Sequence, residues 1–151
     1  MRKPDLPPDK LKDAVLEYLD ERFGLGPELF SDFGFYLASK GRVYLGPKQS
    51  IPKPRIVTIG LLVARVSDAI KPTTNLLQAF GRHVKKNSIP LTKEQTVSYA
   101  RGEDIRPESG DVTDGYVLLT SDGHPLGCGL LKDGTIKNML PKAKRTELKY
   151  L

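Results

Sequence analysis

Two Asp-Gly pairs near the C-terminus constrain the fold of this chain more than any other feature of its sequence. Asp122-Gly123 and Asp133-Gly134 each separate two runs of apolar and alternating residues. Asp-Gly between such runs favours a two-residue β-hairpin turn, because both turn positions need a positive φ angle. The pattern predicts an antiparallel meander with strands over 115–120, 126–131 and 135–140, to which residues 146–150 supply a final strand.

Two helices are expected outside this meander. Thr92 and Gln95 form a capping-box pattern at the start of a short helix, and Gly102 ends it. Near the N-terminus, Asp9 can cap a longer helix whose apolar residues recur at helical spacing as far as Phe23.

The middle of the chain mixes strands with one more helix. Residues 33–45 predict two short strands around Lys40-Gly41, and the apolar run 56–66 predicts a buried strand. Residues 70–87 predict a helix capped by Thr73 or Thr74. The expected fold class is α+β, with an N-terminal α/β subdomain over 1–87 and a small barrel-like module of mostly antiparallel strands over 88–151.

Charge is unevenly distributed along the 151 residues, which carry 24 Lys plus Arg and 18 Asp plus Glu. Residues 33–87 hold 10 basic and 1 acidic side chains, and 131–151 hold 6 and 2. Residues 1–32 hold 5 basic and 8 acidic side chains, and residues 88–130 hold 3 basic and 7 acidic side chains. Basic blocks of this kind attract polyanions, nucleic acid above all, although solvated lysines on an ordinary basic protein give the same pattern.

Composition disfavours several other classes of protein. One cysteine excludes a disulfide framework or a thiolate metal cage, and two distant histidines disfavour a metal site. No glycine-rich loop has the spacing of a phosphate or dinucleotide site, so we expect no cofactor. The first residues lack the apolar core of a signal peptide, and no apolar run reaches the roughly 20 residues of a membrane helix. We expect a cytoplasmic protein without a membrane partner, and the charge-rich composition fits a thermophilic archaeon.

Asp122, His124 and Cys128 are the only candidates for nucleophilic chemistry. A catalytic cysteine needs a base within hydrogen-bond reach, whereas residues 124 and 128 of one strand lie about 13 Å apart. Cys128 is also flanked by two glycines inside an apolar strand, which favours a small buried hydrophobic residue. We therefore expect no catalytic residue and rank an enzyme using His124 and Cys128 last.

Basic side chains gather in three segments, of which the C-terminal one is the largest. Lys and Arg contact phosphates, while Asn can read a base edge or a 2′-hydroxyl. Aromatic residues are few, at 7%, which favours recognition of shape and phosphate over base stacking. The expected main RNA-binding residues are Lys132, Lys137, Asn138, Lys142, Lys144 and Arg145; Arg82, Lys85 and Lys86 extend this face, Arg101 and Gly102 border it, and Lys48, Lys53 and Arg55 form the third cluster.

The second half of the sequence resembles a known family. Its pattern reads, in order, a short helix, Arg101-Gly102-Glu103, the run 115–119, Pro-Leu-Gly-Cys-Gly over 125–129, Lys137-Asn138 and Pro141-Lys142. This order resembles a PUA-like RNA-binding domain, nearest to the C-terminal region of the Nol/Nop/Sun family of RNA 5-methylcytosine methyltransferases. Upstream, residues 58–61 and 70–72 are similar to the pre-PUA segment of those proteins and to Nip-type ribosome-assembly adaptors.

The resemblance implies a PUA-like pseudo-barrel that binds RNA. No part of the sequence matches the family's methyltransferase domain, and Cys128 does not correspond to its catalytic cysteines. We therefore expect a stand-alone, non-catalytic RNA-binding adaptor in rRNA or tRNA modification or ribosome biogenesis, with structured rRNA or tRNA as its partner. The alternative is a protein-interaction subunit, whose acidic first helix or acidic block over 88–130 docks a separate methyltransferase or assembly factor.

Overall fold

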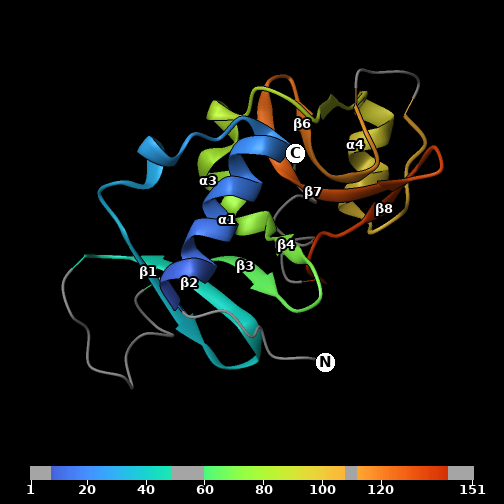
Figure 1. The fold of residues 1–151 in the computed structure, drawn as a ribbon. Helices are drawn as coiled ribbons and strands as arrows, with labels where there is room; N and C mark the ends of the chain where they lie inside the picture. Colours follow the sequence, from blue (N-terminus) through green and yellow to red (C-terminus); the bar gives the residue numbers. More distant parts are fainter. Residues whose placement is uncertain (1–7, 49–59, 108–111, 143–151) are drawn as a thin grey trace.

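The computed structural model describes residues 8–48, 60–107 and 112–142, and these residues form two four-stranded sheets with helices around them (Figure 1). This architecture confirms the expected α+β class. The second sheet has the order β5-β6-β7-β8, and within the described residues it does not close into a barrel. Among the helices of the described ranges, none is long and apolar enough to cross a bilayer.

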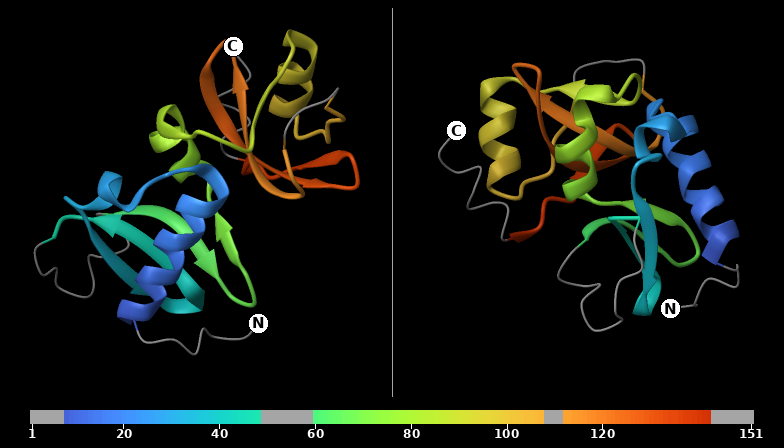
Figure 2. Two further views of the ribbon diagram at one scale, coloured as in Figure 1. Left: turned by 45° about the horizontal axis from the view of Figure 1, so that its top comes forward. Right: turned by 90° about the vertical axis from the view of Figure 1, so that its left-hand side faces the viewer.

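The first sheet is antiparallel throughout and lies under the N-terminal helix. Its strands are β1 (Gly34–Ala38), β2 (Arg42–Gly46), β3 (Leu61–Val66) and β4 (Ile70–Pro72), in that order. The helix α1 (Pro8–Phe23) runs across one face of this sheet (Figure 2). A 3-10 turn, η1 (Pro27–Phe30), connects α1 to β1, and another, η2 (Ser39–Gly41), forms the predicted hairpin turn at Lys40-Gly41.

The second sheet contains the predicted meander. β6 (Gly115–Ser121), β7 (His124–Lys132) and β8 (Thr135–Asn138) are antiparallel. Both Asp-Gly turns have positive φ at both residues, 50° and 79° at the first and 52° and 80° at the second, as the hairpin pattern requires. The helix α4 (Lys93–Ala100) has the predicted capping box between Thr92 and Gln95.

The chain between the sheets departs from the sequence prediction. Only α3 (Thr74–Phe80) and the 3-10 turn η4 (Gly81–His83) are helical, and Thr73 caps α3. Residues 70–72 are β4 instead, and 88–90 form β5 (Ser88–Pro90), a short parallel strand beside β6 that was not predicted. Residues 84–87 leave the helix because they bond to the end of α1: the Lys85 N–H donates to Phe23 O at 2.8 Å. Here a tertiary contact overrides a helical pattern.

Three other strand predictions need comment. The strand predicted over 56–66 begins at Leu61 within the described residues, and its first part lies outside them. The third meander strand ends at residue 138, two residues earlier than predicted, because Asn138 turns toward α4. The strand predicted over 146–150 lies outside the described residues.

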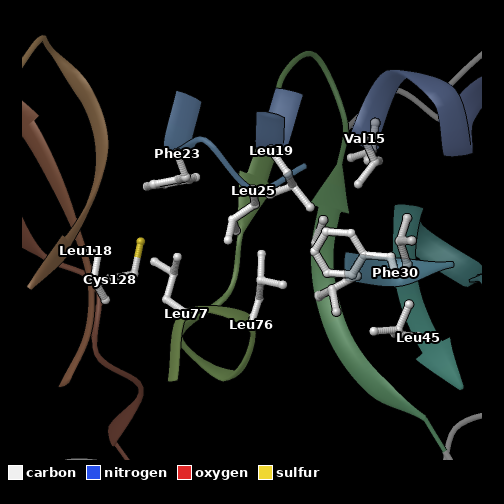
Figure 3. Packing of buried hydrophobic residues seen from close by; sticks show 14 of the residues in the cluster. Val15, Leu19, Phe23, Leu25, Phe30, Leu45, Leu76, Leu77, Leu118 and Cys128 are labelled. Carbon is white, nitrogen blue, oxygen red and sulfur yellow. The ribbon is translucent and has the colours of Figure 1, made fainter. Parts of the chain in front are cut away.

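Two apolar clusters form the core and meet at the second sheet. The first lies between α1, the first sheet and α3, and it includes Leu118 and Cys128 from the second sheet. Figure 3 shows Leu77 of α3 beside this pair, at the junction of the two halves. The second cluster fills the space between α4 and the other face of the second sheet. The division at residue 87 stays a prediction, and the shared cluster indicates that the two halves stabilise each other.

Candidate nucleic-acid interface

The Arg101-Gly102-Glu103 turn ends α4 and is fixed by backbone geometry. Gly102 has a φ of 88°, the left-handed conformation that glycine adopts most easily. The Gly102 N–H donates to Tyr99 O at 3.0 Å, and the Glu103 N–H donates to Ser98 O at 3.0 Å. These two bonds are those of a Schellman motif, so Gly102 serves the helix end and leaves the Arg101 side chain exposed beside it.

Asn138 ties this turn to the last strand. Its Nδ2 donates to Tyr99 O at 2.8 Å and to Glu103 O at 3.0 Å, and its Oδ1 accepts from the Leu140 N–H at 2.9 Å. The two motifs at 101–103 and 137–138, which are 35 residues apart, therefore form one hydrogen-bonded unit. The Asn138 amide is thus used within the protein, where it holds the turn against the last strand.

The β7–β8 hairpin displays two of the predicted lysines on one face. Leu130 pairs with Lys137 and Lys132 pairs with Thr135, so both lysines project to the same side of the sheet. Both are exposed, as is Lys142 after the strand. Lys144 and Arg145 lie outside the described residues.

The outer edge of β8 is not open for pairing with another strand. Ile105 and Ile136 exchange two backbone hydrogen bonds, of 3.0 and 2.7 Å. The Asn138 N–H donates to Asp104 Oδ1 at 2.9 Å. A molecule that contacts this hairpin would therefore meet side chains rather than a free strand edge.

Arg82, Lys85 and Lys86 are exposed, and Arg82 lies far from the hairpin lysines along β7. A Cβ on Gly81 would meet Pro125 at 2.6 Å, so Arg82 lies near the start of β7. Lys132 lies at the other end of this nine-residue strand, a separation of roughly 26 Å at about 3.3 Å per residue. One RNA that contacts both Arg82 and Lys132 has to follow the length of β7. Of the third cluster, Lys48 is exposed, whereas Lys53 and Arg55 lie outside the described residues.

The Pro-Leu-Gly-Cys-Gly segment owes its glycines to packing. A Cβ on Gly127 would lie 2.4 Å from the Tyr99 hydroxyl, and one on Gly129 would lie 2.4 Å from Ile136 Cγ2. The Tyr99 hydroxyl occupies the space over Gly127 and donates to Cys128 O at 2.9 Å. Gly127 therefore lets α4 approach β7 closely, which fixes the helix whose end carries Arg101, whereas Gly129 makes room for Ile136 of β8.

Cys128 and His124 do not form a catalytic pair. Cys128 is 1% exposed and packs in the first apolar cluster, whereas His124 is exposed at the start of β7. Burial raises the pKa of the Cys128 thiol to about 12, a shift that the charge of Arg22 opposes in part. A neutral thiol is a much weaker nucleophile than a thiolate, and burial keeps this one away from solvent. Within the described ranges, no group of three His, Cys, Asp or Glu side chains could hold a metal ion.

Arg22 joins the two halves of the molecule and was not identified from the sequence. Its guanidinium donates to Tyr116 O at 2.7 Å, to Thr113 Oγ1 at 2.6 Å and to Thr113 O at 2.7 Å. Asn87 completes the link, since its Nδ2 donates to Arg22 O at 2.6 Å and its Oδ1 accepts from the Thr113 N–H. Burial lowers the pKa of Arg22. Its position as the basic residue in the last turn of α1 was the only sequence signal.

The turn, the hairpin and the glycine segment lie within a stretch that matches a family model. Residues 86–146 match the model described as the methyltransferase RsmF PUA domain. The match confirms the resemblance of the C-terminal half to the PUA-like region of RNA methyltransferases.

Two relatives extend the similarity over most of the chain. A ribosomal RNA small subunit methyltransferase F from Psychromonas ingrahamii is 27% identical over 148 residues, which are 92% of this chain and 30% of that protein. A protein of the same name from Shewanella loihica is 27% identical over 137 residues, 88% of this chain and 27% of that protein. The chain thus spans about a third or less of these relatives' length.

Proposed function

We propose that this chain is an RNA-binding module that contacts structured ribosomal RNA through the β7–β8 hairpin and the residues after it. The observation that carries the proposal is the match of residues 86–146 to the PUA domain of an rRNA methyltransferase family. The structure supports it with two exposed lysines on one face of a hairpin whose edge is closed, so that they meet a partner through their charges. We favour structured rRNA over tRNA as the partner because both relatives are named for ribosomal RNA.

The proposed contact residues divide into two roles. Exposed cations touch phosphates, whereas Gly102 and Asn138 hold the turn and the strand that present them. The contacting residues are Lys132, Lys137, Lys142, Lys144, Arg145 and Arg101; Arg82, Lys85 and Lys86 extend the face, with Arg82 near the other end of β7.

We further propose that the chain is not an enzyme and that it acts as an adaptor in rRNA modification in the cytoplasm. The buried thiol of Cys128, with its raised pKa, supports this view. A second candidate role is docking of a methyltransferase or assembly protein through α1, whose acidic side chains are all exposed. These carboxylates repel RNA and suit a basic protein surface. They are Asp9, Asp13, Glu17, Asp20 and Glu21.

Binding of a fluorescein-labelled RNA stem-loop, measured by fluorescence anisotropy, tests the proposal. We expect Lys132→Gln with Lys137→Gln to weaken binding at 0.1 M salt by about five- to eightfold per lost phosphate contact, since each contact contributes roughly 0.7–0.9 to the salt slope. A control with the same change in charge is Lys10→Gln with Lys93→Gln, on the exposed surfaces of α1 and α4. Unchanged affinity in the hairpin variant, and after charge reversal at Lys142, Lys144 and Arg145, would show that this site assignment is wrong.

A further inference from the structure

The face of the first sheet opposite α1 carries a row of cations from three neighbouring strands. Arg42 of β2 lies directly opposite Arg65 of β3, and Arg65 lies opposite Lys71 of β4. Residues paired in this way project to the same face. Their neighbours Val43, Ala64 and Ile70 belong to the apolar cluster under α1, so the cations point away from that helix.

Without a bound partner, this row of like charges should lower the stability of the fold. Like charges directly opposite each other in a sheet destabilise it. Among the described residues, the Arg65 and Lys71 side chains are exposed and have no hydrogen bond or ion pair. None of the described strand positions on this face is acidic, and Asp68, the one acidic residue within 33–87, lies in the turn between β3 and β4.

The Arg42 guanidinium is held in place by three hydrogen bonds and a ring contact. Its Nε donates to Ser39 O at 3.0 Å, and its Nη1 and Nη2 donate to Tyr44 OH at 3.2 Å and to Ser39 Oγ at 3.0 Å. The guanidinium lies 5.9 Å from the centre of the Tyr44 ring. Because a guanidinium has five N–H donors, about two remain for a ligand, on a group whose side-chain entropy is already reduced.

The residues of this face favour a phosphate backbone over other ligands. Tyr44 is only 7% exposed, so it cannot serve as a base-stacking platform, and Tyr36, which pairs with it on the same face, is half-buried with its hydroxyl bonded to Pro47 O. Cores of protein–protein interfaces are rich in apolar and aromatic side chains and poor in charge. The exposed large apolar side chains of the described ranges are Phe33, Leu37, Val97 and Met139, and none of them occupies a strand position of this face.

We propose that Arg42, Arg65 and Lys71 form a second RNA-contacting surface, the sheet-face row, which binds the phosphate backbone without reading sequence. The proposal rests on the RNA-binding function proposed above and adds a surface on the other sheet. The row crosses two strand spacings, about 10 Å, and Lys40 lies exposed in the hairpin turn at its β1–β2 end. RNA bound at both sheets would be held across the module and not only at the C-terminal hairpin.

The test is the double variant Arg65→Gln with Lys71→Gln, in the full chain, with the fluorescein-labelled stem-loop as probe. Loss of two phosphate contacts should flatten the slope of log affinity against log salt by about 1.4–1.8 and weaken binding at 0.1 M salt by about 25- to 60-fold. The urea midpoint should stay equal or rise, because only unpaired like charges are removed. The charge-preserving variant Arg65→Lys with Lys71→Arg should keep the wild-type slope.

Each other outcome contradicts a different statement. If the wild type binds RNA and the double variant has the same RNA affinity and salt slope as the Lys10→Gln, Lys93→Gln control, the sheet-face row does not contact RNA. The proposed function then stands. If wild type does not bind RNA at low salt, both proposals fail. If RNA binding is unchanged but the double variant alone loses retention on a polyglutamate resin, the row binds an acidic protein instead. A lower urea midpoint would show that the cations stabilise the fold.

Discussion

Replacing Asn138 tests whether this residue positions the interface or reads RNA. Asn138→Ala removes three side-chain hydrogen bonds, to Tyr99 O, Glu103 O and the Leu140 N–H. At about 1 kcal/mol for each bond, the loss is about 2–3 kcal/mol of unfolding free energy. In a domain of this size, that corresponds to a fall in Tm of about 4–12 °C.

Urea and thermal unfolding followed by circular dichroism measure this loss. Lys137→Ala is the matched control, because that side chain is exposed and has no partner among the described residues, so its change should stay below about 0.5 kcal/mol. Asn138→Asp should cost more than Asn138→Ala near neutral pH. It places a carboxylate against two carbonyl oxygens, next to the Asp104 carboxylate that accepts from the Asn138 N–H.

The positioning role is refuted by either of two combinations of results. If Asn138→Ala keeps the wild-type Tm but loses RNA affinity, then Asn138 touches RNA directly. If it loses stability and its RNA affinity below Tm stays within twofold of wild type, the hairpin cations do not depend on the turn at 101–103. We expect both stability and affinity to fall.

Three further predictions concern the core and the junction between the sheets. Gly127→Ala should destabilise the fold by about 1–3 kcal/mol, since its Cβ would clash with the Tyr99 hydroxyl; Gly123→Ala, whose Cβ would meet nothing within 4 Å, is the control for space, although its positive φ adds strain. Arg22→Ala should lower the urea midpoint by removing three hydrogen bonds, whereas Lys10→Ala should not. Cys128 should react slowly with iodoacetamide in the folded state, and stability should fall as pH rises from about 9 to about 12, because the unfolded thiol ionises first. Cys128→Ala should flatten this alkaline loss, and equal losses in both proteins would contradict the assignment.

Local patterns in the sequence were sufficient to predict the elements that depend on them. The two Asp-Gly turns, the capping box at Thr92 and the amphipathic first helix involve residues at most a few positions apart, so periodicity and turn chemistry determine them. The confirmed resemblance to PUA-like domains also rests on short motifs in a fixed order.

Features that depend on distant contacts could not be predicted in this way. The segment 84–87 is not helical because it bonds to the end of α1, although its sequence continues a helical pattern. Arg42, Arg65 and Lys71 are 23 and 6 residues apart in sequence and form a row only through strand register. Conversely, Arg82 and Lys132 carry the same charge in the sequence, but the structure places them near opposite ends of β7.

RNA affinity of the wild-type chain across a salt series tests the central claim most directly. With the labelled stem-loop, the account predicts tight binding at low salt and a linear fall of log affinity with log salt, with a slope of about 3 or more, as several phosphate contacts require. A flat salt dependence, or no binding at low salt, would contradict RNA binding by these cations and direct the search to a protein partner of α1.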